Sequence, residues 1–128
     1  MLRYQLYDSG REKVLLESEI AFIRNYLALQ QECALTGFSW SVTAEGRMNR
    51  FITPALLMLP VEAIMSRQPP GLAVHFSAYE QEITAHFTVS GGDAAEYDLS
   101  PVEQKLTLLG YEFGLHKTNG SIELKLVC

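Results

Sequence analysis

The chain has 128 residues and a formal net charge of −5, with 10 lysines and arginines against 15 aspartates and glutamates. This length fits one domain that can bury a sizeable core. The basic residues are scattered singly, so no basic stripe is present on which phosphates could lie, and nucleic-acid binding is disfavoured. The apolar stretch 56–64 is too short to cross a bilayer and contains Pro60 and Glu62, so we expect no direct membrane insertion.

The cysteine content favours a reducing compartment. The chain has two cysteines, Cys33 and Cys128, without metal-ligand spacing and outside the context of a small secreted protein. No basic segment followed by an apolar one resembles a secretion signal. We therefore predict a cytoplasmic protein with reduced thiols, in which Cys33 is half-buried on a helix.

Residues 17–33 predict a long helix. Their apolar side chains recur at steps of three and four, which places them in two neighbouring stripes on one helix. The first stripe contains Leu16, Ile20, Ile23 and Leu27, and the second contains Phe22, Tyr26, Leu29 and Cys33. Upstream, residues 2–7 are expected to be the tail of a further helix, and residues 8–10 to form the break between the two.

Two later segments predict shorter helices. Pro54 suits the first turn of a helix over 54–67, but Pro60 then requires a kink or a late helix start, because an interior proline loses a backbone hydrogen bond. Residues 99–109 predict the second helix, with Ser100 as its N-cap and Pro101 in its first turn.

Three alternating segments predict strands. Residues 38–42 alternate apolar and polar side chains, as a half-buried strand does. Residues 72–78 and 83–89 predict a hairpin with its turn at Glu80 and Gln81, because this register places both apolar faces on one side of the sheet. It pairs Ala78 with Ile83 and Phe76 with Ala85.

A second hairpin is predicted at Asn119 and Gly120, since a type I′ turn requires positive φ at both central positions. Its register pairs Leu115 with Leu124 and Phe113 with Leu126. The order of elements predicts an α+β two-layer sandwich, in which a five-stranded mixed sheet carries helices on one face. The inner face is expected to include Trp40, Phe76, Phe87, Phe113, Leu115 and Leu124, packed against Ile20, Ile23, Leu27 and Leu106.

The order of the segments LRYQLYD, EKVLLESEIAFIRNYLALQ and PALLMLPVEAI resembles the LytS-type sensor histidine kinases of bacteria. In that family the last turns of the phosphoacceptor and dimerisation helices lead into an ATP-binding domain of the histidine-kinase and gyrase fold. The resemblance implies that residues 1–10 end the dimerisation helix and residues 11–128 form the ATPase-like domain. The apolar residues Leu2, Tyr4, Leu6 and Tyr7 are then expected to fold back on the domain or to mediate weak self-association.

The family pattern departs from this sequence where the family binds magnesium and phosphate. The family's second segment reads like PPLLLQPLVENAIKHG, and its asparagine coordinates the magnesium that bridges the nucleotide phosphates. Here that position falls on Ala63, whose methyl group cannot ligate a hard cation. The family's phosphate-loop glycines are replaced by Glu96, Tyr97 and Asp98, which prevent close backbone approach and would repel a phosphate. We expect ATP and magnesium, the family's cofactors, not to bind.

Few residues remain as candidates for nucleotide contacts. Glu62 lies at the general-base position of the related ATPases, although a solvated helix face also carries glutamates. Asp93, after Gly91 and Gly92, is a candidate remnant of the family's first glycine motif, whose acid contacts adenine, although such turns are common. No metal site is predicted: His75 and His86 would face each other on the polar face of the sheet, but two imidazoles alone make a weak site.

The resemblance implies a signal-transduction domain of a two-component sensor histidine kinase, degenerate and without catalytic activity of its own. Its implied partners are the parent sensor kinase or a response regulator, with a homodimer through the upstream helix. The implied location is the cytoplasmic part of a membrane-anchored sensor. Two alternatives stay open: a working ATP-binding catalytic domain, kept in view by Glu62 and Asp93, and a non-enzymatic binding or scaffold module with the same layout.

Overall fold

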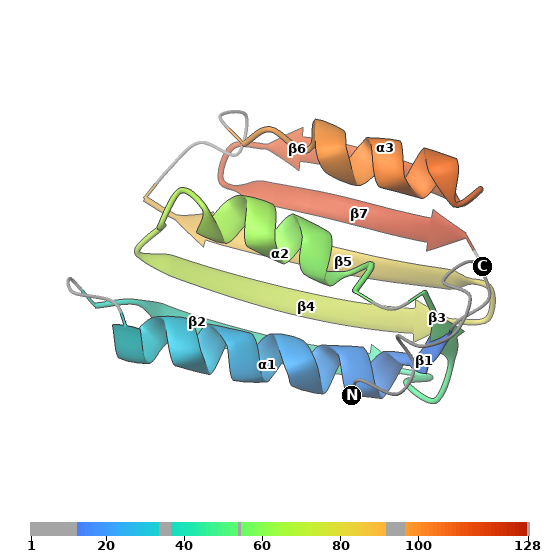
Figure 1. Ribbon diagram of the computed structural model, residues 1–128, viewed down its shortest axis with the longest axis horizontal. Coiled ribbons are helices and arrows are strands. Elements are labelled where there is room, and N and C mark those ends of the chain that lie inside the picture. The colour runs from blue at the N-terminus through green and yellow to red at the C-terminus, as the bar shows by residue number, and fades with distance from the viewer. Residues whose placement is uncertain (1–12, 34–36, 54, 92–96, 128) are drawn as a thin grey trace.

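The structure, a computed structural model, describes residues 13–33, 37–53, 55–91 and 97–127. A five-stranded sheet forms one layer, and the helices α1 (Leu16–Cys33), α2 (Met58–Met65) and α3 (Ser100–Leu108) lie side by side across one of its faces (Figure 1). The predicted two-layer sandwich, with a mixed sheet and helices on one face, is confirmed. No helix among the described residues is long and apolar enough to cross a membrane.

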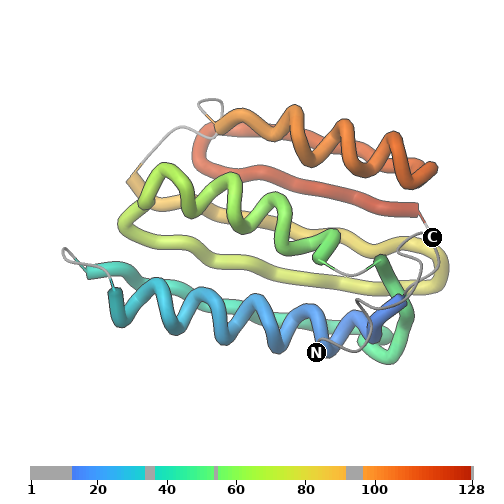
Figure 2. Tube along the Cα trace, in the orientation of Figure 1, coloured from blue at the N-terminus to red at the C-terminus, as the bar shows by residue number. Residues whose placement is uncertain are grey.

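The strand order of the large sheet is β2-β4-β5-β7-β6. The strands are β2 (Ser39–Gly46), β4 (Gly71–Tyr79), β5 (Glu82–Ser90), β6 (Glu112–Thr118) and β7 (Ser121–Val127). Strand β2 runs parallel to β4, and the other neighbours are antiparallel. In Figure 2 the chain can be followed from α1 through the β4–β5 hairpin to α3 and the β6–β7 hairpin.

Both predicted hairpin registers are confirmed. The paired residues are Ala78 with Ile83, Phe76 with Ala85, Leu115 with Leu124, and Phe113 with Leu126. The turn residue Glu80 has a φ of 48°. The predicted type I′ turn is wrong: Gly120 has a φ of 85°, but Asn119 does not have the positive φ that this turn type requires at both central positions. These registers put alternate residues of each strand on the helix side, where they form the core.

A second, two-stranded sheet was not predicted from the sequence. Strand β1 (Val14–Leu15) pairs with β3 (Phe51–Ile52), and each is too short to show an alternating pattern. The backbone N–H of Leu16 donates to the carbonyl of Arg50 at 2.6 Å, which ties the first turn of α1 to this small sheet.

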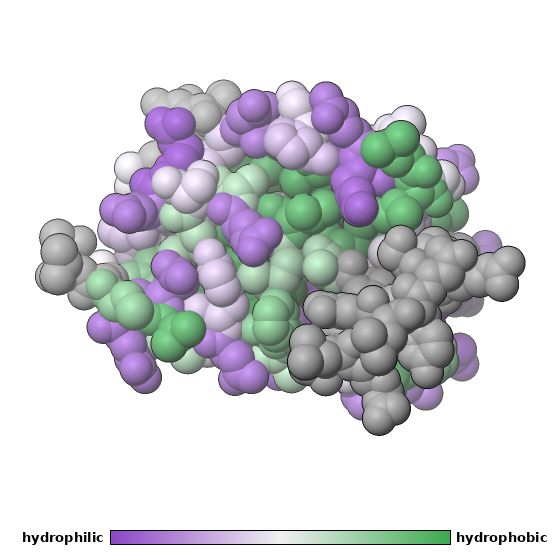
Figure 3. All heavy atoms as spheres, viewed as in Figure 1, coloured by the Kyte–Doolittle hydropathy of each residue, from purple (hydrophilic) through white to green (hydrophobic). Residues whose placement is uncertain are grey.

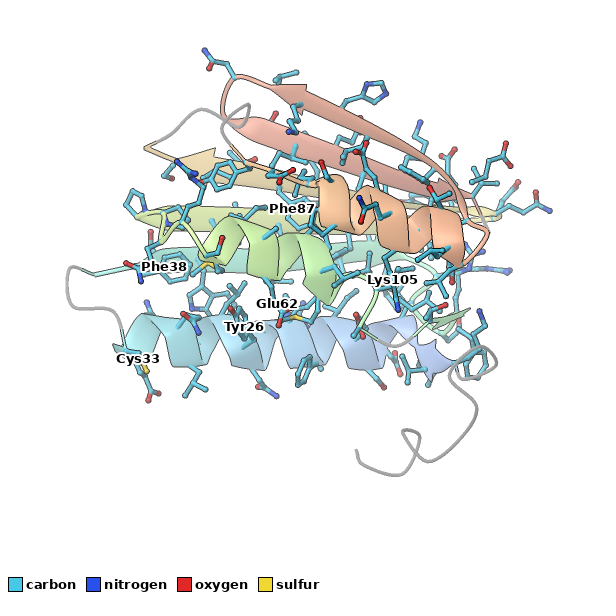
Figure 4. All side chains as sticks on the ribbon, turned by 45° about the horizontal axis from the view of Figure 1, so that its top comes forward. Tyr26, Cys33, Phe38, Glu62, Phe87 and Lys105 are labelled. Carbon is cyan, nitrogen blue, oxygen red and sulfur yellow. The ribbon has the colours of Figure 1, made fainter. Side chains whose placement is uncertain are left out.

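One of the two predicted stripes of α1 forms the helix–sheet core. The first stripe, Leu16, Ile20, Ile23 and Leu27, is buried. In the second stripe Phe22 is 57% exposed and Leu29 is also exposed. Cys33, predicted to be half-buried, is exposed, because it ends α1 on this outer stripe (Figure 4). A helix lying on a sheet buries only the side that faces it.

The predicted inner face of the sheet is confirmed, and the burial of its side chains decreases from the central strands to the edge strands. Phe76, Phe87 and Leu124 are buried, and Figure 4 shows Phe87 between the helices and the sheet. Trp40 on β2 and Phe113 on β6 pack against the core but are only partly buried, because these are the edge strands.

A buried carboxylate fixes the start of α2. The Glu19 carboxylate on α1 accepts backbone N–H bonds from Ala55 at 3.0 Å, Leu57 at 3.1 Å and Met58 at 3.3 Å. Ala55 has a φ of 64°, a conformation that costs energy outside glycine. The predicted late helix start is confirmed, since Pro60 falls in the first turn of α2, where no backbone N–H is needed.

Candidate functional site

The candidate site lies where α2 ends and where the chain after β5 leads into α3. Arg67 follows α2, and Tyr97 and Asp98 directly precede α3. The guanidinium carbon of Arg67 lies 5.7 Å from the centre of the Tyr97 ring, within the range of a cation–π contact. The end of α2 and the start of α3 are therefore joined by a side-chain contact.

Tyr97 is buried at the start of α3. The residue is only 5% exposed, and it belongs to the hydrophobic core. Its backbone carbonyl accepts a hydrogen bond from the Lys117 ammonium of β6 at 2.6 Å. A buried aromatic ring thus lies beneath Arg67 directly before α3.

The first turn of α3 already has an anionic partner. The Asp98 carboxylate accepts the backbone N–H of Ser100 at 3.0 Å. This hydrogen bond is the main reason why the pKa of Asp98 lies below its ordinary value. The predicted Ser100 N-cap is wrong: Leu99 holds the cap position, Ser100 begins the helix, and Pro101 lies in the first turn as predicted. A phosphate approaching this turn would meet the charge of Asp98.

Glu62 lies on the exposed side of α2. Figure 4 shows Glu62 and Tyr26 pointing into the space between α2 and α1. Burial raises the pKa of the Tyr26 phenol, and the negative charge of Glu62 raises it further. The structure thus places Glu62 beside Tyr26 of α1.

Ala63 follows Glu62 and packs partly buried against the core. Its only oxygen is the backbone carbonyl, which accepts the hydroxyl of Ser66 at 2.7 Å. Magnesium requires several oxygen ligands in near-octahedral geometry. With a methyl group at position 63, the side chain at this position supplies no ligand to a magnesium ion.

The other candidate residue, Asp93, lies outside the described residues, as do Gly92 and Glu96. Gly91 is described and has a φ of 74°. A Cβ atom at Gly91 would lie 2.8 Å from Cγ of Pro70, closer than a side chain tolerates. Packing against Pro70 and the backbone conformation therefore both explain this glycine without a nucleotide.

The predicted pairing of His75 with His86 on the polar face is confirmed. His75 is engaged elsewhere, because Nδ1 lies 2.6 Å from the Thr43 hydroxyl and Nε2 lies 3.1 Å from the Glu45 carboxylate. Over the described ranges, no group of three histidine, cysteine, aspartate or glutamate residues is placed to hold a metal ion.

The Arg67–Tyr97 contact was not predicted from the sequence, although Tyr97 was identified as a replacement for a glycine. Nothing in the sequence around Arg67 indicates that its side chain reaches a residue thirty positions later. The role of Glu19 was also not predicted, because a single acidic residue beside the buried apolar stripe of α1 gives no sign of what it binds. Only the path of the Ala55–Met58 segment in the structure shows which backbone N–H groups the Glu19 carboxylate binds.

Solved histidine kinase structures have a similar fold. The catalytic domain of histidine kinase ThkA, in a nucleotide-free form, superimposes on 89% of this chain and 92% of its own, with a TM-score of 0.58 and 4% identity. The Acinetobacter baumannii histidine kinase AdeS matches 98% of this chain and 70% of its own, with a TM-score of 0.62 and 8% identity. The cytoplasmic segment of histidine kinase QseC matches 98% and 81%, with a TM-score of 0.55 and 19% identity.

No protein-family model matches the sequence, and a comparison with curated proteins finds no match. At the identities of these structural matches, the likeness shows the fold alone. The chain has the fold of the catalytic domains of histidine kinases, as the resemblance implied.

Proposed function

We propose that this chain is a domain of a LytS-type sensor histidine kinase that has kept the ATPase-like fold and lost the binding of magnesium-ATP. The proposal joins the histidine-kinase fold to the resemblance carried by residues 2–31 and 54–67. In this proposal the domain transmits a signal by contact with other proteins. Its location is the cytoplasmic end of a membrane-anchored sensor.

The observation that carries the loss of nucleotide binding is the position of Tyr97. The resemblance puts the phosphates at the first turn of the helix that follows the lid, which corresponds to α3. In this chain the residues directly before that turn are Tyr97, whose ring lies beneath Arg67, and Asp98. The Asp98 carboxylate already accepts the backbone N–H of Ser100. In addition, the family's magnesium-ligating asparagine is replaced by Ala63, which supplies no side-chain ligand. By the resemblance, Glu62 corresponds to the general base of the related ATPases, and Asp93 is a candidate remnant of the motif whose acid contacts adenine.

The proposed partners are a response regulator, the parent sensor kinase or an active kinase of the same type, because a domain without nucleotide chemistry acts through its surfaces. The family's homodimer through the helix preceding the domain belongs to the same proposal. These partners are inferred from the resemblance and the fold.

Radiolabelled ATP tests this function on the protein that carries the chain. We expect no label to be incorporated when that protein is incubated alone with ATP and magnesium. A histidine kinase with an intact asparagine in its α2 segment serves as the positive control. Acid-labile label on a histidine of the protein itself would contradict the proposal and favour a working catalytic domain.

A further inference from the structure

A pocket with both polar and apolar walls lies at the end of the molecule where β1, β3, β7 and the segment after α3 meet. We call it the end pocket; it has a volume of about 340 Å³ and is lined by Lys13, Phe51, Thr53, Leu109, Gly110, Tyr111 and Val127. Phe51 is 65% exposed and Val127 is 41% exposed. Figure 3 shows apolar surface, in green, at the end of the molecule where α3 ends. Large apolar side chains that stay exposed around a concave site mark a binding surface.

The walls of the end pocket are held in place. The Tyr111 hydroxyl lies 2.8 Å from the Thr53 hydroxyl and accepts the backbone N–H of Thr53 at 3.3 Å. Pairing of Leu15 with Phe51 ties one wall to β1. The ammonium of Lys13 lies 5.8 Å from the centre of the Tyr111 ring. The pocket therefore exists before an occupant arrives, which reduces the entropic cost of binding.

The sequence offers an occupant directly beside this pocket. Lys13 lines the pocket and is the first described residue, so residues 1–12 join the domain at the pocket's rim. These residues include the apolar side chains Leu2, Tyr4, Leu6 and Tyr7. They are followed by Asp8, Ser9 and Gly10, residue types that favour a reversal of the chain.

We propose that the end pocket is the docking site of the chain's own segment 2–7, with Leu6 or Tyr7 inserted beside Phe51 and Val127. Residues 8–12 can span about 17 Å when extended, enough to bring Leu6 and Tyr7 back to the pocket. A connector this short gives an effective concentration in the millimolar range, so the attached segment outcompetes a second copy at micromolar protein. This inference does not depend on the proposed signalling function.

Disulfide trapping tests the docking directly. Cys33→Ser and Cys128→Ser remove both native thiols, and Leu6→Cys is then combined with Phe51→Cys. We expect oxidation to give an intramolecular disulfide whose yield does not change with protein concentration. The matched control combines Leu6→Cys with Glu123→Cys, on the opposite face of the sheet, and should remain reduced.

Three results would overturn the proposal: no disulfide in the first pair, equal yields in both pairs, or a disulfide that forms only between two molecules. The last result would assign the end pocket to a second copy.

Thermal unfolding gives an independent readout. Removing residues 1–10 and substituting Phe51→Ser should each lower Tm by about 4 °C or more, and the two changes together should lower it no further than either alone. Phe22→Ser on the outer side of α1, where Phe22 is also exposed, is the control whose effect should add to the truncation. Additive effects of Phe51→Ser and the truncation would contradict the docking.

Discussion

The guanidinium group of Arg67 lies over the ring of Tyr97, and this contact joins the end of α2 to the start of α3. Truncation of Tyr97 to Ala removes a buried aromatic side chain from the core. We expect a loss of about 3–5 kcal/mol in the free energy of unfolding, measured by urea denaturation. Tyr111→Ala, at a partly buried tyrosine elsewhere, is the comparison and should cost less. A loss below about 1 kcal/mol at Tyr97 would mean that its ring is not part of the core.

Restoring the family's asparagine alone should not restore nucleotide binding. In Ala63→Asn the amide supplies one metal ligand, but Tyr97 and Asp98 still oppose a phosphate at the start of α3. We expect no increase in Tm with millimolar ATP and magnesium, since only a ligand that binds the folded state stabilises it. If Ala63→Asn by itself gains ATP-dependent stability, the segment before α3 is not the barrier.

Glu19 should be essential for the start of α2. In Glu19→Ala the backbone N–H groups of Leu57 and Met58 lose their acceptor inside the protein. We expect a loss of at least about 2 kcal/mol in the free energy of unfolding, because each buried unsatisfied donor costs about 1–3 kcal/mol. Glu32→Ala, at an exposed position of the same helix, should change the stability by less than about 0.5 kcal/mol. Equal effects of the two substitutions would refute this role for Glu19.

The same carboxylate should make stability depend on pH. Burial raises the pKa of Glu19 and outweighs the backbone N–H bonds from Ala55, Leu57 and Met58, which lower it. The folded state therefore binds the proton more tightly than the unfolded state does. The stability that Glu19 gains by binding this proton is fully present below the pKa of the unfolded state, and it is lost as pH rises through the pKa of the folded state.

The comparison variant for this pH dependence is Glu19→Gln, which cannot titrate. Measured between about pH 4 and pH 8, the unfolding free energy of the native chain relative to Glu19→Gln should fall as pH rises. A relative stability that rises over this range would show that the hydrogen bonds to the carboxylate dominate.

Phe87 on β5 tests the assignment of the faces of the sheet. Its side chain is fully buried between the sheet and the helices, so Phe87→Ala should cost about 3–5 kcal/mol in chemical denaturation. Phe22→Ala, on the exposed side of α1, should cost less than about 1 kcal/mol. The reverse order of the two losses would contradict this assignment of the core.

The registers of both hairpins could be predicted because a shift of one residue would move every apolar side chain to the wrong face. Ser100 as an N-cap could not be distinguished from Ser100 as the first helical residue, since both put a hydroxyl beside Pro101. The burial of Cys33 was misjudged because two parallel stripes on α1 look alike until the sheet is known. The contacts of Arg67 with Tyr97 and of Glu19 with Leu57 depend on how distant segments meet, which local patterns do not contain.

Isothermal titration of the chain with ATP and magnesium is the decisive measurement for the proposed loss of nucleotide binding. We predict no saturable binding with a Kd below about 100 μM, which corresponds to roughly −5.5 kcal/mol. A catalytic domain of a histidine kinase that keeps the asparagine should bind under the same conditions and serves as the control. Saturable, magnesium-dependent binding to this chain below that Kd would contradict the proposal and identify a working nucleotide site.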